Sequence, residues 1–231
     1  MLFRSKLNFD YMASIPLLIQ ETTERNHVSK CKHWSNPPVN YLKINSDGSF
    51  TDISNEAGIG IVCRDYEGTF KWGFIDKVKS ISAFMTEALA LKKALLLALD
   101  LGYDMVMFET DCMLLKQNIV KDGSEIYEWQ SRSIILEIVK LLSSQAGFSI
   151  CFTPREGNGI ADHLAAEAHK EVNPIGWVHT PSPLLSHLLA LDVKRLNKLP
   201  RSAYDSTSQW VQDMRGVLLP SSPSSHCSGI G

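Results

Sequence analysis

The residues from Ala83 to Gly102, AFMTEALALKKALLLALDLG, form the longest apolar periodic stretch of the sequence. Strong helix formers fill this stretch, and a glycine closes it. A helix of this kind gains most of its stability by packing its apolar face against other structure. The sequence therefore predicts a central helix that covers a sheet. The residues that recur at the spacing of one helix face are Phe84, Ala88, Leu91, Leu95, Ala98 and Leu99.

Glu87 interrupts this apolar face, because it lies three residues after Phe84 and four before Leu91. A carboxylate is costly to bury unless it is hydrogen-bonded or binds a metal. Two interpretations are open at this point. Glu87 is either a first-turn acid that the helix dipole stabilises and that leans into water, or a ligand in a buried site. The choice depends on whether other carboxylates reach the same place.

The composition allows a folded core and gives no sign of a membrane span. The chain has 231 residues, 44% of them apolar, and a net charge of −2 without a basic tract. No run of 18 apolar residues occurs, and the N-terminus lacks the features of a signal peptide. Five scattered cysteines fit reduced thiols in an intracellular protein, cytoplasmic or nuclear. Cys31 and His33 are spaced like a pair of zinc ligands, but no second pair occurs at a suitable spacing, so a structural zinc site is not expected.

Composition shifts divide the chain into four parts. Residues 1–40 are weakly periodic and predict a poorly ordered leader, which Asn36-Pro37-Pro38 ends. Residues 41–170 carry the strong patterns of one domain, and residues 171–201 predict a helical tail. Residues 202–231 are rich in Ser, Pro and Gly, which predicts disorder.

Within residues 41–170 the pattern predicts the order β-β-β-α-β-α-α-β-α. The first three strands form an antiparallel meander, and a strand reached through a helix is usually parallel to its neighbour. The prediction is thus an α/β domain with a mixed sheet. The expected strands are 41–50, 57–64, 69–76, 104–110 and 148–153, and the expected helices are 83–102, 112–121, 126–142 and 160–169.

Four carboxylates occupy matching places in these elements: Asp47, Glu87, Asp111 and Asp162. Each has an ordinary alternative: a hairpin turn for Asp47-Gly48, a helix N-cap for Asp111, and dipole stabilisation in a first turn for the other two. If the first and fourth strands are central neighbours, all four can converge at one edge of the sheet. Such a cluster needs cations, and two Mg²⁺ ions roughly 3.5–4 Å apart can clamp a phosphodiester.

The segments LKINSDGSF, AGIGIVCRDYEG, TEALALKKAL, FETDC and PREGNGIADHLAAEA together resemble the type-1 ribonuclease H domain. The resemblance runs from about Tyr41 to Lys170 and is greatest to the plant reverse-transcriptase-like, retroelement-related branch. Residues 177–192 also resemble a short tail that often follows this branch. The resemblance implies a five-stranded mixed sheet in the order 3-2-1-4-5, flanked by helices. It also implies Mg²⁺-dependent cleavage of the RNA strand of an RNA–DNA hybrid, with Mn²⁺ as a substitute ion.

The resemblance also implies a role for each acid. Asp47 would bridge both metal ions, and Asp162 would hold one of them. Glu87 and Asp111 would hold the ion beside the attacking water. Ten residues before the last acid, the family usually has a histidine that assists proton transfer, and this sequence has Phe152. A phenyl ring cannot transfer a proton. His163 projects roughly 100° away from its neighbour Asp162 and is not expected to replace that histidine.

Binding to nucleic acid is expected to be weak and salt-sensitive. Residues 121–132, which correspond to a basic handle in bacterial members, are short and not basic. Residues 41–170 carry 13 Lys and Arg against 18 Asp and Glu, and without the four candidate ligands the charge is −1. Recognition would use shape and 2′-hydroxyl contacts. The residues expected near the backbone are Gly48, Ser49, Arg155 and Asn158, with Lys43 beside them; Arg155 is equally well read as a surface charge.

The sequence leaves three functional readings open. The complete acidic set favours an active hybrid nuclease that works as a monomer. Phe152 and the missing handle favour a catalytically weak or inactive, retroelement-derived nucleic-acid-binding module. A Tyr-x-Asp-Asp polymerase signature is absent from the sequence, so reverse transcription is not expected. A folded remnant without a biochemical role is the third reading.

Overall fold

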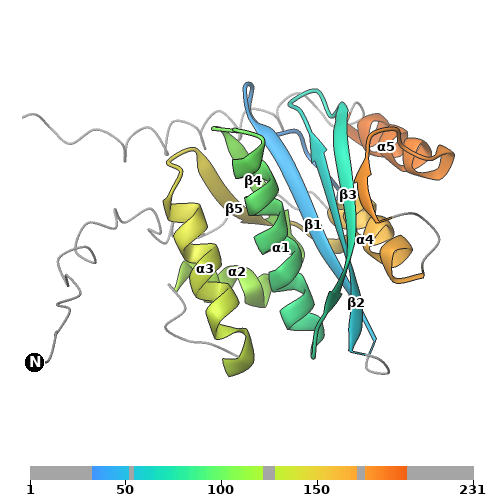
Figure 1. Ribbon diagram of the computed structural model, residues 1–231. Coiled ribbons are helices and arrows are strands. Elements are labelled where there is room, and N and C mark those ends of the chain that lie inside the picture. The colour runs from blue at the N-terminus through green and yellow to red at the C-terminus, as the bar shows by residue number, and fades with distance from the viewer. Residues whose placement is uncertain (1–32, 52–54, 122–127, 171–174, 197–231) are drawn as a thin grey trace, which may run out of the picture. The chain divides into compact units, whose positions relative to one another are not determined.

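The computed structural model describes residues 33–51, 55–121, 128–170 and 175–196 (Figure 1). The expected tail at 202–231 and most of the expected leader at 1–40 lie outside the described residues, and the division into domains stays a prediction. Residues 33–40 are described, and they include Trp34, which is buried. That part of the expected leader therefore contributes to the folded core.

Six strands and five α-helices make up the described chain, together with one short 3₁₀ helix, η2 (Trp129–Ser131). The strands are β1 (Leu42–Phe50), β2 (Glu56–Arg64), β3 (Phe70–Lys79), β4 (Val106–Thr110), β5 (Phe148–Phe152) and β6 (Gly176–Val178). The helices are α1 (Ala83–Asp100), α2 (Met113–Val120), α3 (Arg132–Ser143), α4 (Arg155–Lys170) and α5 (Pro183–Leu196).

The strands form one mixed sheet in the order β5-β4-β1-β2-β3-β6 (Figure 1). The first three strands are antiparallel, and β4 and β5 add in parallel beyond β1. The predicted class and the order of the five strands are confirmed. The sheet differs from the prediction by a sixth strand, β6, which pairs antiparallel with β3 and lies within the expected helical tail at 171–201.

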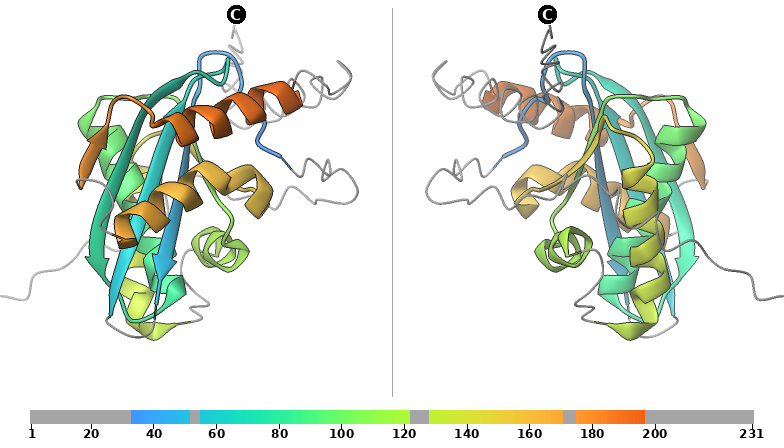
Figure 2. Two further views of the ribbon diagram at one scale, coloured as in Figure 1. Left: turned by 90° about the vertical axis from the view of Figure 1, so that its right-hand side faces the viewer. Right: turned by 90° about the vertical axis from the view of Figure 1, so that its left-hand side faces the viewer.

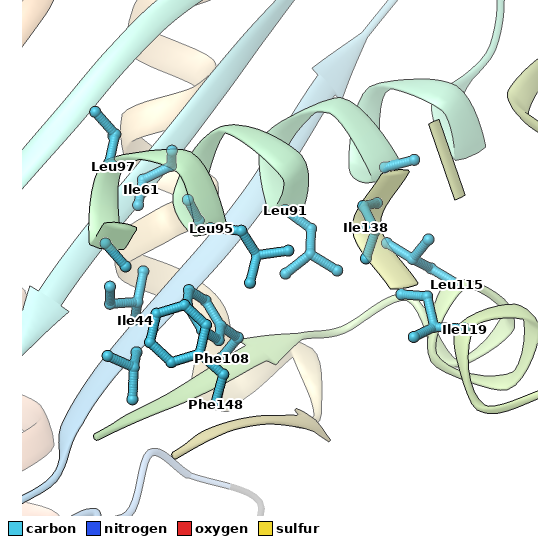
Figure 3. Close-up of a cluster of buried hydrophobic side chains, with 14 of the residues drawn as sticks. Ile44, Ile61, Leu91, Leu95, Leu97, Phe108, Leu115, Ile119, Ile138 and Phe148 are labelled. Atoms are coloured by element: carbon cyan, nitrogen blue, oxygen red, sulfur yellow. The ribbon is translucent and has the colours of Figure 1, made fainter. Parts of the chain in front are cut away.

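Helix α1 packs its apolar row against the sheet, as the periodicity predicts. The side chain of Ser82 caps the helix by accepting a hydrogen bond from Met85 N at 3.0 Å. Helix α3 lies on the same side of the sheet (Figure 1), and α2 adds Leu115 and Ile119 to the same core. Figure 3 shows Leu91 and Leu95 among the strand side chains of this cluster.

Helices α4 and α5 cover the opposite face of the sheet (Figure 2). Their apolar residues pack on Val62 and Ile75. Helix α4 lies almost against the backbone of β2, since a Cβ atom on Gly60 would come within 2.4 Å of the Ala161 carbonyl oxygen. Only glycine permits this approach. The close packing fixes the distance between α4 and the neighbouring strand β1. None of the described helices combines the length and apolar character that crossing a bilayer would require.

Candidate active site

Three of the four predicted acids meet at one place. Asp47 lies on β1, Glu87 on α1 and Asp111 directly after β4, and one carboxylate oxygen of each lies within 4.8 Å of the other two. The parallel register explains part of this, because Asn45 is paired with Glu109. Two residues further along each strand, on the same face, come Asp47 and Asp111. Asp47 is only 5% exposed.

Asp162 lies at the margin of this cluster rather than inside it. Asp162 is exposed on α4, although its charge is close enough to raise the pKa of Asp47. The expected first-turn position was wrong, because α4 begins at Arg155 and not at residue 160. Asp162 therefore sits well inside the helix, where the dipole of the first turn does not account for it.

The alternatives for Glu87 and Asp111 are also wrong. Helix α1 begins at Ala83 and has no acidic residue in its first turn, so Glu87 belongs to the second turn. Cys112 is the N-cap residue of α2, and no side chain caps that helix. Both carboxylates are therefore free of the helix-end roles that would otherwise explain them.

The three clustered carboxyl groups strongly disfavour being charged together. Burial raises the pKa of Asp47 to about 8, and the charges of Asp111 and Asp162 add to the rise, while a hydrogen bond from Asn158 opposes it. Burial also raises the pKa of Glu87 well above its usual value, with the charges of Asp47 and Asp111 adding to it. Without a cation, this cluster retains protons near neutral pH.

The donor set fits a divalent cation. Oε2 of Glu87 is buried and has no hydrogen-bond partner within the described chain. A buried oxygen without a partner normally costs free energy, and here it lies next to two further carboxylates. Hard divalent ions such as Mg²⁺ bind such oxygens. Asp47, Glu87 and Asp111 are thus able to hold a metal ion.

The residues expected at a nucleic-acid interface fall into two groups. The Arg155 side chain is 94% exposed, and its Nε lies 3.5 Å from Oδ2 of Asp111. Gly48 and Ser49 are half-buried near the end of β1. The backbone N–H of Gly48 donates a hydrogen bond to the Glu87 carboxylate. Contact of these three residues with nucleic acid stays a prediction.

Asn158 and Lys43 lie in the interior instead, each 1% exposed. Asn158 Nδ2 donates to Oδ1 of Asp47 at 3.2 Å and to the Ser46 carbonyl oxygen at 3.1 Å. Lys43 Nζ lies 2.5 Å from Oε1 of Glu109. Their burial argues against direct contact with a nucleic acid. The expected helix began at residue 160, so Asn158 was expected before it. In the structure Asn158 lies in α4, and its amide contacts β1.

Sequence reasoning missed Asn45 and Glu109, which lie in the same buried layer as the acids. Asn45 Nδ2 donates to Oε2 of Glu109 at 2.9 Å. The signal was present as period-2 alternation, since Lys43, Asn45 and Asp47 share one face of β1. Three polar residues on one face of a central strand indicate a polar layer behind the acids.

The position of the family's usual histidine carries a half-buried phenyl ring, that of Phe152, at the end of β5. His163 does not take its place, because its Nε2 lies 3.2 Å from Oε1 of Glu167 along the same helix. Nε2 of His163 is buried and forms no hydrogen bond within the described chain. Within the described chain, the site thus contains an acid cluster and an exposed arginine but no histidine in the expected place.

Comparisons with known proteins agree with this fold. A family model described as reverse transcriptase-like matches residues 45–168. The fold is similar to RNase H1 from the halophilic archaeon Halobacterium salinarum, with a TM-score of 0.52 and 25% identity over 57% of this chain and 99% of that one. No curated protein matches the chain. The plant branch stays a prediction.

Two further solved structures show the same fold. An N-terminal RNase H domain from Mycobacterium tuberculosis gives a TM-score of 0.51 with 20% identity, over 57% of this chain and 94% of that one. LC11-RNase H1, solved in complex with an RNA/DNA hybrid, gives a TM-score of 0.50 with 22% identity, over 57% of this chain and 99% of that one. At this level of identity, the two structures support the fold alone.

Proposed function

This chain belongs to the reverse transcriptase-like family, and from that premise we propose that it is a metal-dependent endonuclease that hydrolyses the RNA strand of RNA–DNA hybrids. The observation that carries the proposal is the meeting of Asp47, Glu87 and Asp111, with one buried oxygen of Glu87 left without a partner. The similarity to RNase H1 of Halobacterium salinarum supports it.

In this proposal, Asp47, Glu87 and Asp111 hold the divalent ions, and Asp162 approaches from α4 to complete the set. The ions would be Mg²⁺, with Mn²⁺ able to replace it. When bound, a pair of such ions stabilises the attacking and leaving oxygens of an in-line displacement. Asp47 is buried, accepts a hydrogen bond from Asn158 of α4 and lies beside the end of β4. It would be the ligand shared by the ions, as the resemblance to ribonuclease H implies.

The protein's own groups then orient the substrate and release protons. Asp47 and Glu87 lose their protons as they take up cations, because the cation favours the charged carboxylate. Arg155 is exposed beside Asp111 and is placed to contact a phosphate of the hybrid. Phe152 provides no proton. The leaving oxygen therefore takes its proton from solvent, and turnover should lack an acid–base contribution of typically ~10²–10⁴-fold.

Cleavage of a labelled RNA–DNA hybrid by the full chain tests the proposal. Mg²⁺-dependent products are expected from the wild type, with Mn²⁺ as a parallel arm, and RNA–RNA and DNA–DNA duplexes should stay intact. Asp111→Asn should abolish cleavage without unfolding the protein. Asp104→Asn is a matched control. Asp104 is exposed and precedes the start of β4, whereas Asp111 follows the end of this strand. A folded wild type that yields no metal-dependent product would remove the nuclease proposal.

A second candidate is a nucleic-acid-binding module with weak catalysis or none. Two observations favour it: Phe152 replaces the usual histidine, and residues 41–170 carry an excess of five acidic charges. Hybrid binding that survives in Asp111→Asn, measured by fluorescence anisotropy at several salt concentrations, together with no cleavage by the wild type, would support this candidate over the first.

The state and place of action are also part of the proposal. We propose a monomer that acts in the cytoplasm or nucleus, where the scattered cysteines stay reduced. Cys63 and Cys112 are free cysteines in the described chain. Light scattering at micromolar concentration tests the monomer, and imaging of a tagged chain tests the location.

A further inference from the structure

A buried polar layer lies behind the acid cluster, between the sheet and helices α4 and α5. It contains two cations, Lys43 and Arg64, and two anions, Glu109 and Asp192, all 7% exposed or less. Lys43 pairs with Glu109, and Arg64 Nη1 lies 2.9 Å from Oδ2 of Asp192. Opposite charges are buried in equal number, so each buried charge of the layer has a partner of opposite sign.

Asn45 stands at the centre of this layer, and its amide group is fully used. Its Oδ1 accepts from Trp34 Nε1 at 3.1 Å and from Arg64 Nη2 at 3.3 Å. Its Nδ2 donates to Glu109 Oε2 at 2.9 Å and to Asn158 Oδ1 at 3.2 Å. If the Asn45 amide were flipped, its NH₂ group would face the N–H donors of Trp34 and Arg64. These contacts therefore determine the orientation of Asn45.

Asn45 in turn determines the orientation of Asn158. Because Oδ1 of Asn158 accepts the Asn45 hydrogen, its Nδ2 must face the other way. There it donates to the Ser46 carbonyl oxygen and to Oδ1 of Asp47. The Asp47 carboxylate is thus held by a side chain that is itself 1% exposed and has one allowed orientation.

This series of contacts begins at Trp34 and Asp192, which lie outside residues 45–168. The Arg64 guanidinium stacks over the Trp34 ring at 3.6 Å and is paired with Asp192 of α5. Burial lowers the pKa of Arg64 to about 10, with Asp192 opposing the shift, so the group stays charged at neutral pH. Trp34 precedes the matched residues and Asp192 follows them. Two flanking segments therefore reach the site through Arg64 and Asn45.

We propose that Asn158 is the positioning residue for Asp47 and that Trp34, Arg64 and Asp192 set its orientation through Asn45. The inference rests on the proposed function, because it takes Asp47 to be a metal ligand. It adds that two segments outside residues 45–168, at Trp34 and in α5, act on the metal site through these contacts. Groups that hydrogen-bond to metal ligands typically contribute 10–100-fold to metal affinity.

Mg²⁺ binding by the full chain, measured by isothermal titration calorimetry, tests the inference. Asn158→Ala should weaken binding by about 10–100-fold. The double variant Arg64→Met/Asp192→Leu should weaken it in the same direction but less, because Trp34 still contacts Asn45. Replacing both partners leaves no buried charge alone, which protects the fold. The same variants should raise the Mg²⁺ concentration needed for half-maximal cleavage more than they lower the maximal rate.

Leu164→Ala is the matched control for a purely structural effect. Leu164 is buried on the same helix in the apolar cluster with Val62 and Ile75. It should lower the melting temperature and leave the Mg²⁺ affinity of the folded protein unchanged. Equal losses of affinity in Leu164→Ala and Asn158→Ala would overturn the positioning role.

The remaining outcomes separate this inference from the proposed nuclease activity. Wild-type Mg²⁺ affinity in Asn158→Ala would overturn the inference even if the wild type cleaves hybrids. A wild type that binds Mg²⁺ without cleaving, with weaker binding in Asn158→Ala, would support the inference and remove the activity. A wild type that binds no Mg²⁺ would overturn the inference outright. If Asn158→Ala does not fold, unchanged affinity in the double variant would overturn it.

Discussion

The backbone N–H of Gly48 on β1 donates a hydrogen bond to the carboxylate of Glu87 on α1. The side chain of Asp47, the residue before Gly48, accepts a hydrogen bond from Asn158 of α4. Two successive residues of β1 thus contact the site's groups, Gly48 through its backbone N–H and Asp47 through its side chain. This relationship requires that α1 approach the β1 backbone very closely.

Gly48→Ala should therefore destabilise the protein and weaken Mg²⁺ binding. A Cβ atom at residue 48 would come within 2.6 Å of Thr86 Cγ2 and 2.9 Å of the Thr86 carbonyl carbon. The strand and helix must separate, and overpacking of this kind typically costs about 1–3 kcal/mol. Urea unfolding measures the free energy, and calorimetry with Mg²⁺ measures the effect on the site.

Gly159→Ala provides the contrasting substitution. Gly159 is exposed within α4, and an added Cβ would meet no atom within 4 Å. Because alanine is the better helix former by about 0.8–1.0 kcal/mol, this change should stabilise the protein. Loss of stability in both variants to the same degree would contradict the steric argument for Gly48.

The meeting of Asp47, Glu87 and Asp111 was predictable from sequence because the type and order of the elements around them are clear. The start of α4 was not predictable, since Pro154 and two glycines, Gly157 and Gly159, are typical of a loop. Tertiary packing overrides this local preference. A Cβ atom on Gly157 would come within 2.5 Å of Thr153 Oγ1 and 3.3 Å of Trp34 N, so the glycine allows the segment at residue 34 to pack there.

The helix of the tail was predicted, whereas strand β6 and the contact of α5 with Arg64 were not. Strand β6 has three residues, too few for a period-2 pattern to be recognised. What holds it is the contact of Trp177 with Trp72 and Phe74, at ring-centroid distances of 5.3 and 5.4 Å. The pairing of Asp192 with Arg64 spans 128 residues of sequence, which no local pattern reveals.

The metal-free protein should become less stable as the pH rises from about 4 to about 8. The pKa of Asp47 is raised to about 8 in the folded state, and in the unfolded chain it returns to its ordinary value. Between these values the folded state holds a proton that the unfolded chain has released, so stability decreases with rising pH. Thermal melting in EDTA across this range measures the trend.

Two comparisons test that explanation. Asp47→Asn removes the titrating group and should flatten the pH dependence of the melting temperature. Mg²⁺ should stabilise the wild type more at pH 8 than at pH 6, because fewer protons compete with it. At a hundredfold excess over Kd the gain is about 2.7 kcal/mol. A pH dependence that Asp47→Asn leaves unchanged would assign the titration to another group.

The buried pair of Lys43 and Glu109 should show strong coupling in a double-mutant cycle. Lys43→Met leaves the Glu109 carboxylate buried with one hydrogen bond from Asn45, and loss of one partner from a buried pair typically costs about 3–5 kcal/mol. Lys43→Met/Glu109→Gln keeps an acceptor for Asn45 and leaves no charge. Its loss in urea unfolding should be smaller than the sum of the two single losses. Additive losses would show that the two charges do not interact.

Arg155→Ala should weaken hybrid binding without affecting stability. The side chain is 94% exposed, so its removal opens no cavity and breaks only the long contact to Asp111. A phosphate contact contributes through counterion release, so the slope of log K against log salt should fall in magnitude by about 1. Arg132→Ala, which removes an exposed arginine at the start of α3, is the control and should leave the slope unchanged if the hybrid lies along the acid cluster. Anisotropy titrations with Asp111→Asn as the common background separate binding from cleavage, and equal slopes for both arginine variants would place the hybrid elsewhere.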